Sequence, residues 1–250
     1  MSETRPVRLN KYLAEAGLAS RRGADALIQS GRVRVNGLVQ REPGIRIIPG
    51  QDTVLFDGVP VSSGRDAGPV YVMLHKPVHT VTTASDPQGR KTVLDLLPDE
   101  LRAKRLFPVG RLDYMSEGLL LLTNDGEVTL RLTHPSFEHS KKYEVLVREA
   151  VPEKSLGVMR QGMRLREGER LAPVQVEATL DAGGATLLRM TLRQGVNRQI
   201  RRMCRDLGLT ILRLRRVELG PLRLGGLASG KWRALTDSET TNLKSSLGLD

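Results

Sequence analysis

A run of small, polar and helix-breaking residues constrains the fold of this chain more than any other feature. Residues 62–69 read Ser-Ser-Gly-Arg-Asp-Ala-Gly-Pro, a composition typical of a linker. The 250 residues are enough for a small and a large domain. We therefore predict a domain at 1–63, a linker at 64–69, a larger domain at 70–243 and a C-terminal tail at 244–250.

The composition excludes several classes of protein. Cys204 is the only cysteine, which rules out an intramolecular disulfide framework and a cysteine-rich metal site. The four histidines form no HExxH-type pattern with a carboxylate, so we predict no metal; they are His75, His79, His134 and His139. Neither a signal-peptide core nor a run of ~18 apolar residues is present, which predicts a cytoplasmic protein that does not enter a membrane.

Positive charge is concentrated in two segments. The chain has 39 Lys+Arg and 28 Asp+Glu, a net charge of +11. Residues 1–65 carry 10 basic and 6 acidic side chains, and residues 185–233 carry 12 and 2. Neither segment pairs its arginines with aromatics as a helix on a lipid surface would. Nucleic acid is therefore the favoured polyanionic partner.

The first segment has the pattern of two helices followed by a hairpin. Apolar residues recur at helical spacing from Leu9 to Ala16, and Gly17 can close that helix in the left-handed conformation. Ser20 can cap a second helix that ends near Gly31. Valines and arginines then alternate at 32–35, and the Asn-Gly pair that follows is a strong hairpin signal.

Local helix stability does not explain the positions of two arginines in this segment. Arg21 and Arg22 would lie in the first turn of the second helix, where the helix dipole disfavours cations. Exposed arginines without a function are one interpretation, and an edge that binds RNA phosphates is the one we favour. The residues of that edge are Arg8, Lys11, Arg21, Arg22, Arg32 and Arg34. The runs at 8–13, 19–22 and 28–37 resemble the small RNA-binding module named after ribosomal protein S4.

The larger segment mixes strands and helices. Alternating or continuous apolar runs predict strands at 70–74, 119–123, 143–147, 187–192 and 210–217. Helical patterns fall at 93–97, 128–132, 153–161 and 197–207, and Thr236 begins a capping-box pattern for a terminal helix. Because these elements follow no strict βαβ rhythm, we predict an α+β fold.

One loop of this segment could present a reactive side chain from a rigid support. Residues 110–118 read Gly-Arg-Leu-Asp-Tyr-Met-Ser-Glu-Gly and lie before an apolar run, so a rigid strand would hold the loop. By composition alone, Asp113 is more typical of a loop-capping aspartate than of a catalyst. With residues 119–126, however, the loop closely resembles the active-site motif of bacterial ribosomal RNA pseudouridine synthases.

Other motifs fall in the order and spacing of that family. They are His75-Lys76-Pro77, Lys142-Tyr143 and residues 199–203. The chain departs from the family at His75, where asparagine is usual, and at Met115, where a polar residue is common. The resemblance implies a synthase domain with a mixed, mainly antiparallel sheet beside the helix-rich RNA-binding domain.

The resemblance also implies roles for single residues. Asp113 would be the essential carboxylate, acting as a nucleophile or as a base on a sugar intermediate. Tyr143 would stack on the flipped-out uracil, although its alternation with two valines also suits a core tyrosine. Arg201, on the apolar boundary of the helix at 197–207, would pair with Asp113 and help to keep it ionised.

Further basic residues of the larger domain are predicted RNA contacts. They are Lys76, Arg111, Lys142, Arg198, Arg202, Arg205, Arg213 and Arg215. Arg213 and Arg215 alternate with Leu212 and Leu214, which we expect to point inward.

The expected function is the isomerisation of a uridine in ribosomal RNA, without a cofactor. The motif at 197–202 favours 23S rRNA of the large subunit, and 16S rRNA is the alternative. A non-catalytic rRNA-binding assembly factor would explain the basic segments equally well. The expected partner is ribosomal RNA or a subunit-assembly intermediate, and the resemblance suggests a monomer.

Overall fold

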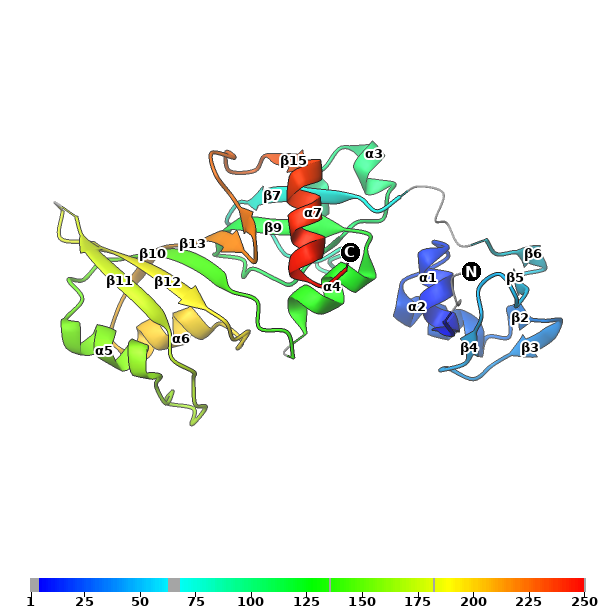
Figure 1. Ribbon diagram of the computed structural model, residues 1–250, viewed down its shortest axis with the longest axis horizontal. Coiled ribbons are helices and arrows are strands. Elements are labelled where there is room, and N and C mark those ends of the chain that lie inside the picture. The colour runs from blue at the N-terminus through cyan, green and yellow to red at the C-terminus, as the bar shows by residue number, and fades with distance from the viewer. Residues whose placement is uncertain (1–4, 63–67, 135, 182, 250) are drawn as a thin grey trace. The chain divides into compact units, whose positions relative to one another are not determined.

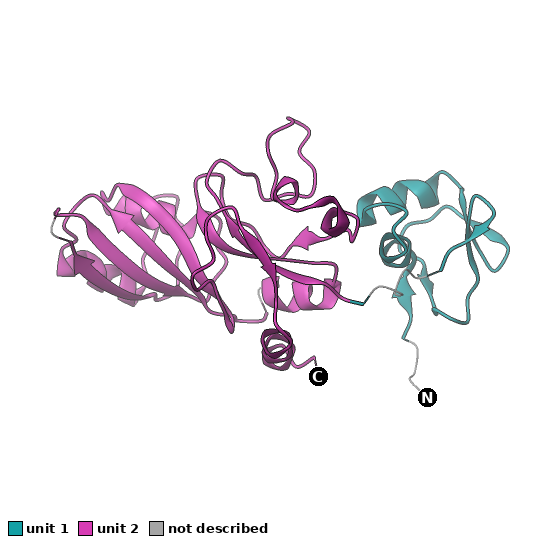
Figure 2. Cartoon of the chain, turned by 90° about the horizontal axis from the view of Figure 1, so that it is seen from above, with its two compact units in different colours: residues 1–68 teal, residues 69–250 magenta. Residues whose placement is uncertain are grey.

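The computed structural model describes residues 5–62, 68–134, 136–181 and 183–249. The chain forms two compact units, Met1–Gly68 and Pro69–Asp250 (Figure 2). Most of the predicted linker, residues 64–67, lies outside the described residues. Among the described helices none is long and apolar enough to cross a membrane.

The first unit contains the predicted helix pair and hairpin (Figure 1). Its elements are β1 (Val7–Arg8), α1 (Leu9–Glu15), α2 (Arg21–Gln29), β2 (Val33–Val35), β3 (Leu38–Gln40), β4 (Arg46–Ile47), β5 (Val54–Phe56) and β6 (Val59–Pro60). Gly17 adopts the left-handed conformation after α1, and Ser20 caps α2 by accepting a hydrogen bond from the amide of Gly23. Asn36 and Gly37 both have positive φ, as a tight hairpin turn requires.

The core of this unit lies between the helices and the small sheet. Leu9, Leu13 and Ile28 are fully buried and pack against Val33 and Ile47. The sheet runs in the order β3-β2-β5-β6, and β1 pairs separately with β4. The alternation predicted for β2 is confirmed, because its valines are buried and Arg34 is exposed on the other face.

The second unit is built on one nine-stranded sheet. Its strands are β7 (Tyr71–Lys76), β8 (Phe107–Pro108), β9 (Glu117–Thr123), β10 (Lys141–Val147), β11 (Gln175–Leu180), β12 (Thr186–Leu192), β13 (Ile211–Leu219), β14 (Leu222–Arg223) and β15 (Trp232–Ala234). The main order is β11-β12-β10-β13-β9-β7-β15, in which only β13 and β9 pair in parallel. The prediction of an α+β fold with a mixed, mainly antiparallel sheet is confirmed.

Different helices cover the two halves of this sheet, one formed by β10, β11 and β12 and the other by β7 and β9. They are η1 (Leu94–Leu96), α3 (Asp99–Arg102), α4 (Gly126–Thr133), α5 (Glu153–Gln161), α6 (Gln199–Asp206) and α7 (Asp237–Ser246). In Figure 1, α5 and α6 lie against the half formed by β10, β11 and β12, and α4 and α7 lie against β7 and β9.

The strands β7 and β9 are buried on both faces. Met73 and Leu121 face α4 and α7, whereas Leu74 and Leu120 face the opposite cluster, which contains Leu112. Burying each leucine contributes about 1.5–3 kcal/mol, so this strand pair is a rigid support. The loop at 110–116 leads directly into β9 and is therefore anchored at its C-terminal end.

The two halves meet at the parallel pair β9–β13. Gly118 on β9 is in register with Arg216 on β13 and has a φ of +110°. A Cβ at Gly118 would lie 2.2 Å from the carbonyl oxygen of Arg216. Only glycine allows the two backbones to approach this closely.

Two predictions within this unit are wrong. Leu212 is half exposed rather than inward, because the pairing of β13 with β10 shifts register between Leu146 and Val147 and leaves Leu212 as the extra residue. The predicted tail is not separate over its described residues, 244–249, since α7 continues to Ser246 and Leu247 is buried in the core. The predicted capping box at the start of α7 is confirmed.

Candidate active site

Asp113 begins a tight turn just before β9. The amide of Ser116 donates to the carbonyl oxygen of Asp113 at 3.0 Å, which closes a four-residue turn. The side chain of Asp113 is 38% exposed, whereas Leu112 beside it is buried. The carboxylate is therefore accessible from solvent while its backbone is fixed to the core.

Four donors from two other segments, residues 76–82 and helix α6, hold the same turn. The hydroxyl of Thr82 donates to the carbonyl oxygen of Leu112 at 2.7 Å, and the amide of His79 donates to that of Tyr114 at 2.8 Å. Arg201 donates to the carbonyl of Met115 and Lys76 to that of Ser116, both at 2.8 Å. With the bond that closes the turn, every carbonyl from residue 112 to 116 accepts a hydrogen bond. Such support fixes a reactive side chain in one position.

Arg201 connects this turn to helix α6. The predicted apolar stripe of α6 is buried against the sheet, and Arg201 lies at its boundary with 19% of its side chain exposed. Its Nε lies 3.3 Å from Oδ2 of Asp113, and its Nη2 also donates to Oγ of Ser116 at 2.8 Å. The guanidinium thus contacts both the carboxylate and the turn that carries it.

A second guanidinium lies near the same carboxylate. Nε of Arg198 is 4.0 Å from Oδ2 of Asp113, and its side chain is 61% exposed. Arg198 is the N-cap of α6 and has a left-handed backbone with a φ of +50°, a strained conformation for a residue other than glycine. This backbone places an exposed cation at the rim of the site.

Lys76 is not the surface RNA contact that we predicted. It is fully buried at the end of β7, and its ammonium donates to the carbonyls of Pro77 and Ser116. Burial lowers the pKa of Lys76 from 10.5 to about 8, an effect that Asp113 and Glu117 partly oppose. Lys76 therefore supports the turn from within the core.

Tyr143 lies at the seam between the two halves of the sheet. It is on β10, in register with Arg216 of β13 and Met190 of β12. Its partly buried ring packs against the core of the β10–β12 half and against the cluster that contains Leu112, the neighbour of Asp113. The ring therefore belongs in part to the core, on the side of the sheet on which Leu112 is buried.

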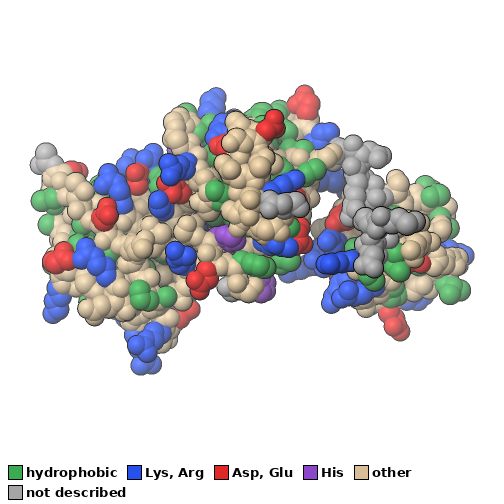
Figure 3. Space-filling view, in the orientation of Figure 1, with side chains coloured by type: hydrophobic (Ala, Val, Ile, Leu, Met, Phe, Trp, Pro, Cys, Tyr) green, Lys and Arg blue, Asp and Glu red, His purple; other side chains and the backbone are tan. Residues whose placement is uncertain are grey.

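The remaining predicted RNA contacts fall into two groups. Figure 3 shows basic side chains spread over the visible surface of each unit, with acidic side chains among them. Those that are exposed and have no ion pair among the described residues are Arg8, Arg21, Arg22, Arg34, Arg111 and Arg213. Those paired with carboxylates are Lys11 with Glu15, Arg32 with Asp57, Lys142 with Glu218, Arg202 with Glu167 and Glu169, Arg205 with Glu167 and Asp206, and Arg215 with Glu144.

Several residues of the site were not predicted from the sequence. Ser116 and Thr82 bind the turn through their hydroxyls, and neither spacing nor composition distinguishes them from other hydroxyl residues. Arg216 is buried and donates to the carbonyl of Leu119 at 2.8 Å. Its position directly after Arg215, on a strand with three arginines, gave no sign of this structural role.

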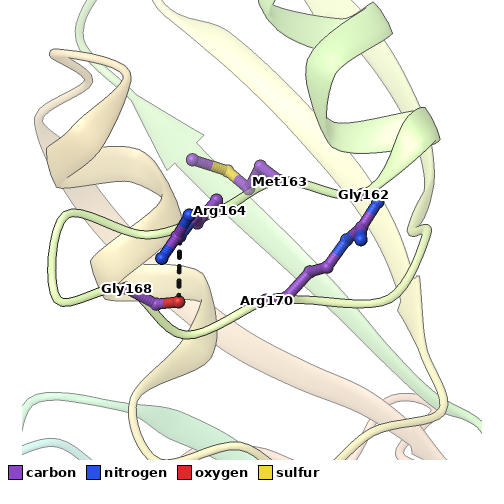
Figure 4. A pocket seen from close by; sticks show the side chains of 5 residues that line it. All are labelled: Gly162, Met163, Arg164, Gly168 and Arg170. Carbon is purple, nitrogen blue, oxygen red and sulfur yellow. Dashed lines mark hydrogen bonds between the residues drawn. The ribbon is translucent and has the colours of Figure 1, made fainter.

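The described residues contain no cluster of three or more His, Cys, Asp or Glu side chains that could bind a metal ion. A hollow of about 430 Å³ between α5 and β11 is lined by Gly162, Met163, Arg164, Gly168 and Arg170 (Figure 4). None of these residues is among the predicted site residues.

Comparison with known proteins gives two family matches. Residues 70–206 match the model described as RNA pseudouridylate synthase, and residues 7–52 match the S4 domain. The first match covers more than half of the chain and contains Asp113, Tyr143 and Arg201.

Similar proteins span nearly the whole chain. An RNA pseudouridine synthase from Aquifex aeolicus is 43% identical over 97% of this chain and 96% of its own length. The ribosomal large subunit pseudouridine synthase B of Bacillus subtilis is 40% identical over 95% of each chain. A crystal structure of a pseudouridylate synthase is 30% identical, covers 95% of this chain and 99% of its own, and has a TM-score of 0.67.

Proposed function

The chain belongs to the RNA pseudouridine synthase family, and we propose that it isomerises one uridine of large-subunit ribosomal RNA with Asp113 as the essential carboxylate. The family and the enzyme class predicted from the loop at 110–118 are confirmed by the family match and by the relatives. The protein is therefore an isomerase that acts on RNA.

The reaction needs one ionised carboxylate beside the ribose. The bond from C1′ to N1 breaks, the uracil rotates, a bond from C1′ to C5 forms, and the C5 proton is lost while N1 gains one. Asp113 can attack C1′ as a nucleophile, or it can remove a ribose proton and so release the base. In both routes the carboxylate reacts in its charged form, and the guanidinium of Arg201 lies 3.3 Å from it.

The target base must leave the RNA stack before it reaches Asp113. Extrusion costs a few kcal/mol, least for an unpaired base, so the target is a loop or otherwise unpaired uridine. We assign Tyr143 as the ring on which the extruded uracil stacks. Its partly buried position against the cluster that contains Leu112 supports this role.

The choice of ribosomal RNA rests on the first unit and on the relatives. The S4 match covers α1, α2 and the hairpin, where Arg21, Arg22 and Arg34 are exposed for phosphate contacts. The Bacillus subtilis relative is named for the large subunit. We propose 23S rRNA, free or in a partly assembled subunit, as the substrate of a monomeric, cytoplasmic enzyme.

The contact between Arg201 and Asp113 is the observation that carries this proposal, and Asp113→Asn tests it. The variant should abolish pseudouridine formation and leave RNA affinity nearly unchanged, because one carboxylate supplies little binding energy. Carbodiimide-dependent primer-extension stops, mapped on both rRNAs from a deletion strain complemented with each form, give the readout. We expect one stop in 23S rRNA that the wild type restores and Asp113→Asn does not.

Other outcomes of this experiment contradict the proposal. A stop restored by Asp113→Asn would refute the role of the carboxylate. A stop in 16S rRNA would move the target to the small subunit. Altered ribosomal-particle profiles in the deletion strain without the loss of any stop would identify a non-catalytic assembly factor.

A further inference from the structure

We propose that the exposed rings of His79 and Tyr114 form a stacking shelf for the nucleobase next to the target uridine. The inference rests on the proposed function, because that function places the target ribose at Asp113, the residue immediately before Tyr114. It adds a subsite for a second nucleotide. The shelf is defined here as the side chains of these two residues.

The two rings are held in a fixed relation to each other. Their centroids are 5.3 Å apart and their planes cross at 73°, an edge-to-face arrangement. The amide of His79 donates to the carbonyl oxygen of Tyr114 at 2.8 Å, so the backbones that carry the rings are also joined. A rigid aromatic surface loses little conformational freedom when a base stacks on it.

The backbone of His79 is left-handed. Its φ is +58°, a conformation that is uncommon outside glycine but that histidine adopts more often than most residues. Uncommon backbone conformations are found preferentially at functional sites. In this conformation the imidazole of His79 contacts the phenol ring of Tyr114 edge to face.

Folding alone does not account for the exposure of the phenol ring. Aromatic residues make up 3% of the chain, yet Tyr114 is 43% exposed and His79 is also exposed. Buried aromatic side chains contribute most to stability, and an exposed one contributes little. An aromatic surface directly beside an essential carboxylate is instead suited to a ligand with a flat ring.

The charges around the shelf favour a nucleotide as that ligand. Arg198 supplies an exposed cation beside the shelf, because its Nε lies 4.0 Å from Oδ2 of Asp113, the residue before Tyr114. Aromatic faces flanked by arginines are the general means of binding single-stranded nucleic acid. When the target uridine leaves the stack, its neighbour loses a stacking partner, and the shelf supplies a replacement.

A cycle of protein and RNA variants tests the shelf. The substrates are a stem-loop that carries the uridine located by stop mapping, and two copies with an abasic site 5′ or 3′ of that uridine. Base–aromatic stacking changes affinity roughly tenfold to a hundredfold. We expect Tyr114→Leu to raise KM about tenfold on the intact stem-loop, to leave kcat within about twofold, and to have no effect on one of the abasic substrates.

Two further variants separate stacking from structure. Tyr114→Phe keeps the ring and should behave as the wild type. His79→Asn removes the other ring but keeps a residue that tolerates positive φ, and it should raise KM with an unchanged melting temperature. The matched control is Phe137→Leu, because Phe137 is 42% exposed and makes a similar edge-to-face contact with His134 outside the catalytic turn. It should not alter KM.

The opposite results overturn the shelf. If the wild type forms pseudouridine but Tyr114→Leu has the same KM as the wild type, or raises KM equally on all three substrates, no flanking base stacks there. If the wild type forms no pseudouridine in any RNA, the proposed function fails first, and the two failures are thus distinguishable.

Discussion

The ammonium of Lys76 lies 2.8 Å from the carbonyl oxygen of Ser116, at the end of the turn that begins with Asp113. The fully buried ammonium of Lys76 thus hydrogen-bonds the last residue of the turn, and Arg201 hydrogen-bonds the carbonyl of Met115 within it. Both groups fix the backbone that carries Asp113. If Asp113 reacts as we propose, this support matters, because a small displacement of a reacting group costs orders of magnitude in rate.

Burial of Lys76 should give the protein a characteristic dependence of stability on pH. Its pKa is about 8 in the folded chain and 10.5 ordinarily, so between these values the unfolded state binds more protons. The free energy of unfolding therefore rises with pH across this window, by at most about 3 kcal/mol from this group. Well below pH 8 Lys76 is charged in the folded chain, and the full cost of burying that charge lowers the free energy of unfolding.

Urea unfolding of the wild type and of Lys76→Met at pH 7.5, 9 and 10.5 measures this effect. Subtracting the free energy of unfolding of Lys76→Met from that of the wild type removes the contributions of the other titrating groups. This difference should increase as the pH rises from 7.5 to 10.5. A difference that does not depend on pH would contradict the prediction. Lys76→Met should also lower kcat, because the carbonyl of Ser116 loses its donor.

Replacement of Arg201 should affect the chemical step rather than RNA binding. Arg201→Ala removes the cation at 3.3 Å from Asp113 and both bonds to the turn, and we expect kcat to fall by about 100-fold or more. Arg201→Lys keeps the positive charge, but an ammonium lacks the planar guanidinium that reaches three acceptor atoms. The kcat of Arg201→Lys should therefore lie between those of Arg201→Ala and the wild type. Single-turnover tritium release from C5-labelled RNA gives the rates, and equal activity of all three proteins would refute the assignment.

Most of the fold could be predicted from local patterns. Gly17, Ser20 and the Asn36-Gly37 turn specify the first unit because each fills a conformation or cap that few residues can. Alternation and apolar runs likewise located five strands of the large sheet. The same reasoning failed for Leu212, because a register shift depends on the partner strand and has no signal in its own strand.

The site could be predicted only in part. The motif resemblance located Asp113, and the amphipathic pattern of α6 placed Arg201 at the apolar boundary, where it reaches the carboxylate. Lys76 was misassigned because a lysine before proline in the sequence gives no measure of burial. Arg202 and Arg205 were predicted as RNA contacts, and nothing in the sequence indicated that they pair with Glu169 and Glu167, more than 30 residues away.

Arg198 should contribute to RNA binding and not to chemistry. Its exposed guanidinium at the rim suits a phosphate contact near the target nucleotide. Arg198→Asn keeps a residue compatible with the left-handed backbone, so the fold should remain intact. We expect KM to rise, kcat to stay close to that of the wild type, and the slope of log affinity against log salt to fall by about 1. A large fall in kcat without a change in the salt slope would instead place Arg198 in the chemical step.

The contact between Gly118 and Arg216 should make Gly118→Ala among the most damaging small substitutions in the chain. The new Cβ would lie 2.2 Å from a backbone oxygen that cannot move without separating β9 from β13, and the positive φ adds strain. We expect a loss of at least about 3 kcal/mol in the free energy of unfolding, or an insoluble protein. Because β9 follows the catalytic turn, the remaining folded protein should also lose activity.

Gly126→Ala is the matched control for this substitution. Gly126 is the first residue of α4, and a Cβ there meets no heavy atom within 4 Å. Alanine at this position should leave the stability unchanged or raise it by about 0.4–1 kcal/mol, since it restricts the unfolded chain. Urea unfolding and soluble yield compare the two variants. Similar stabilities for both would show that the parallel pair tolerates a side chain and that the two halves of the sheet are joined less closely than the backbone contact indicates.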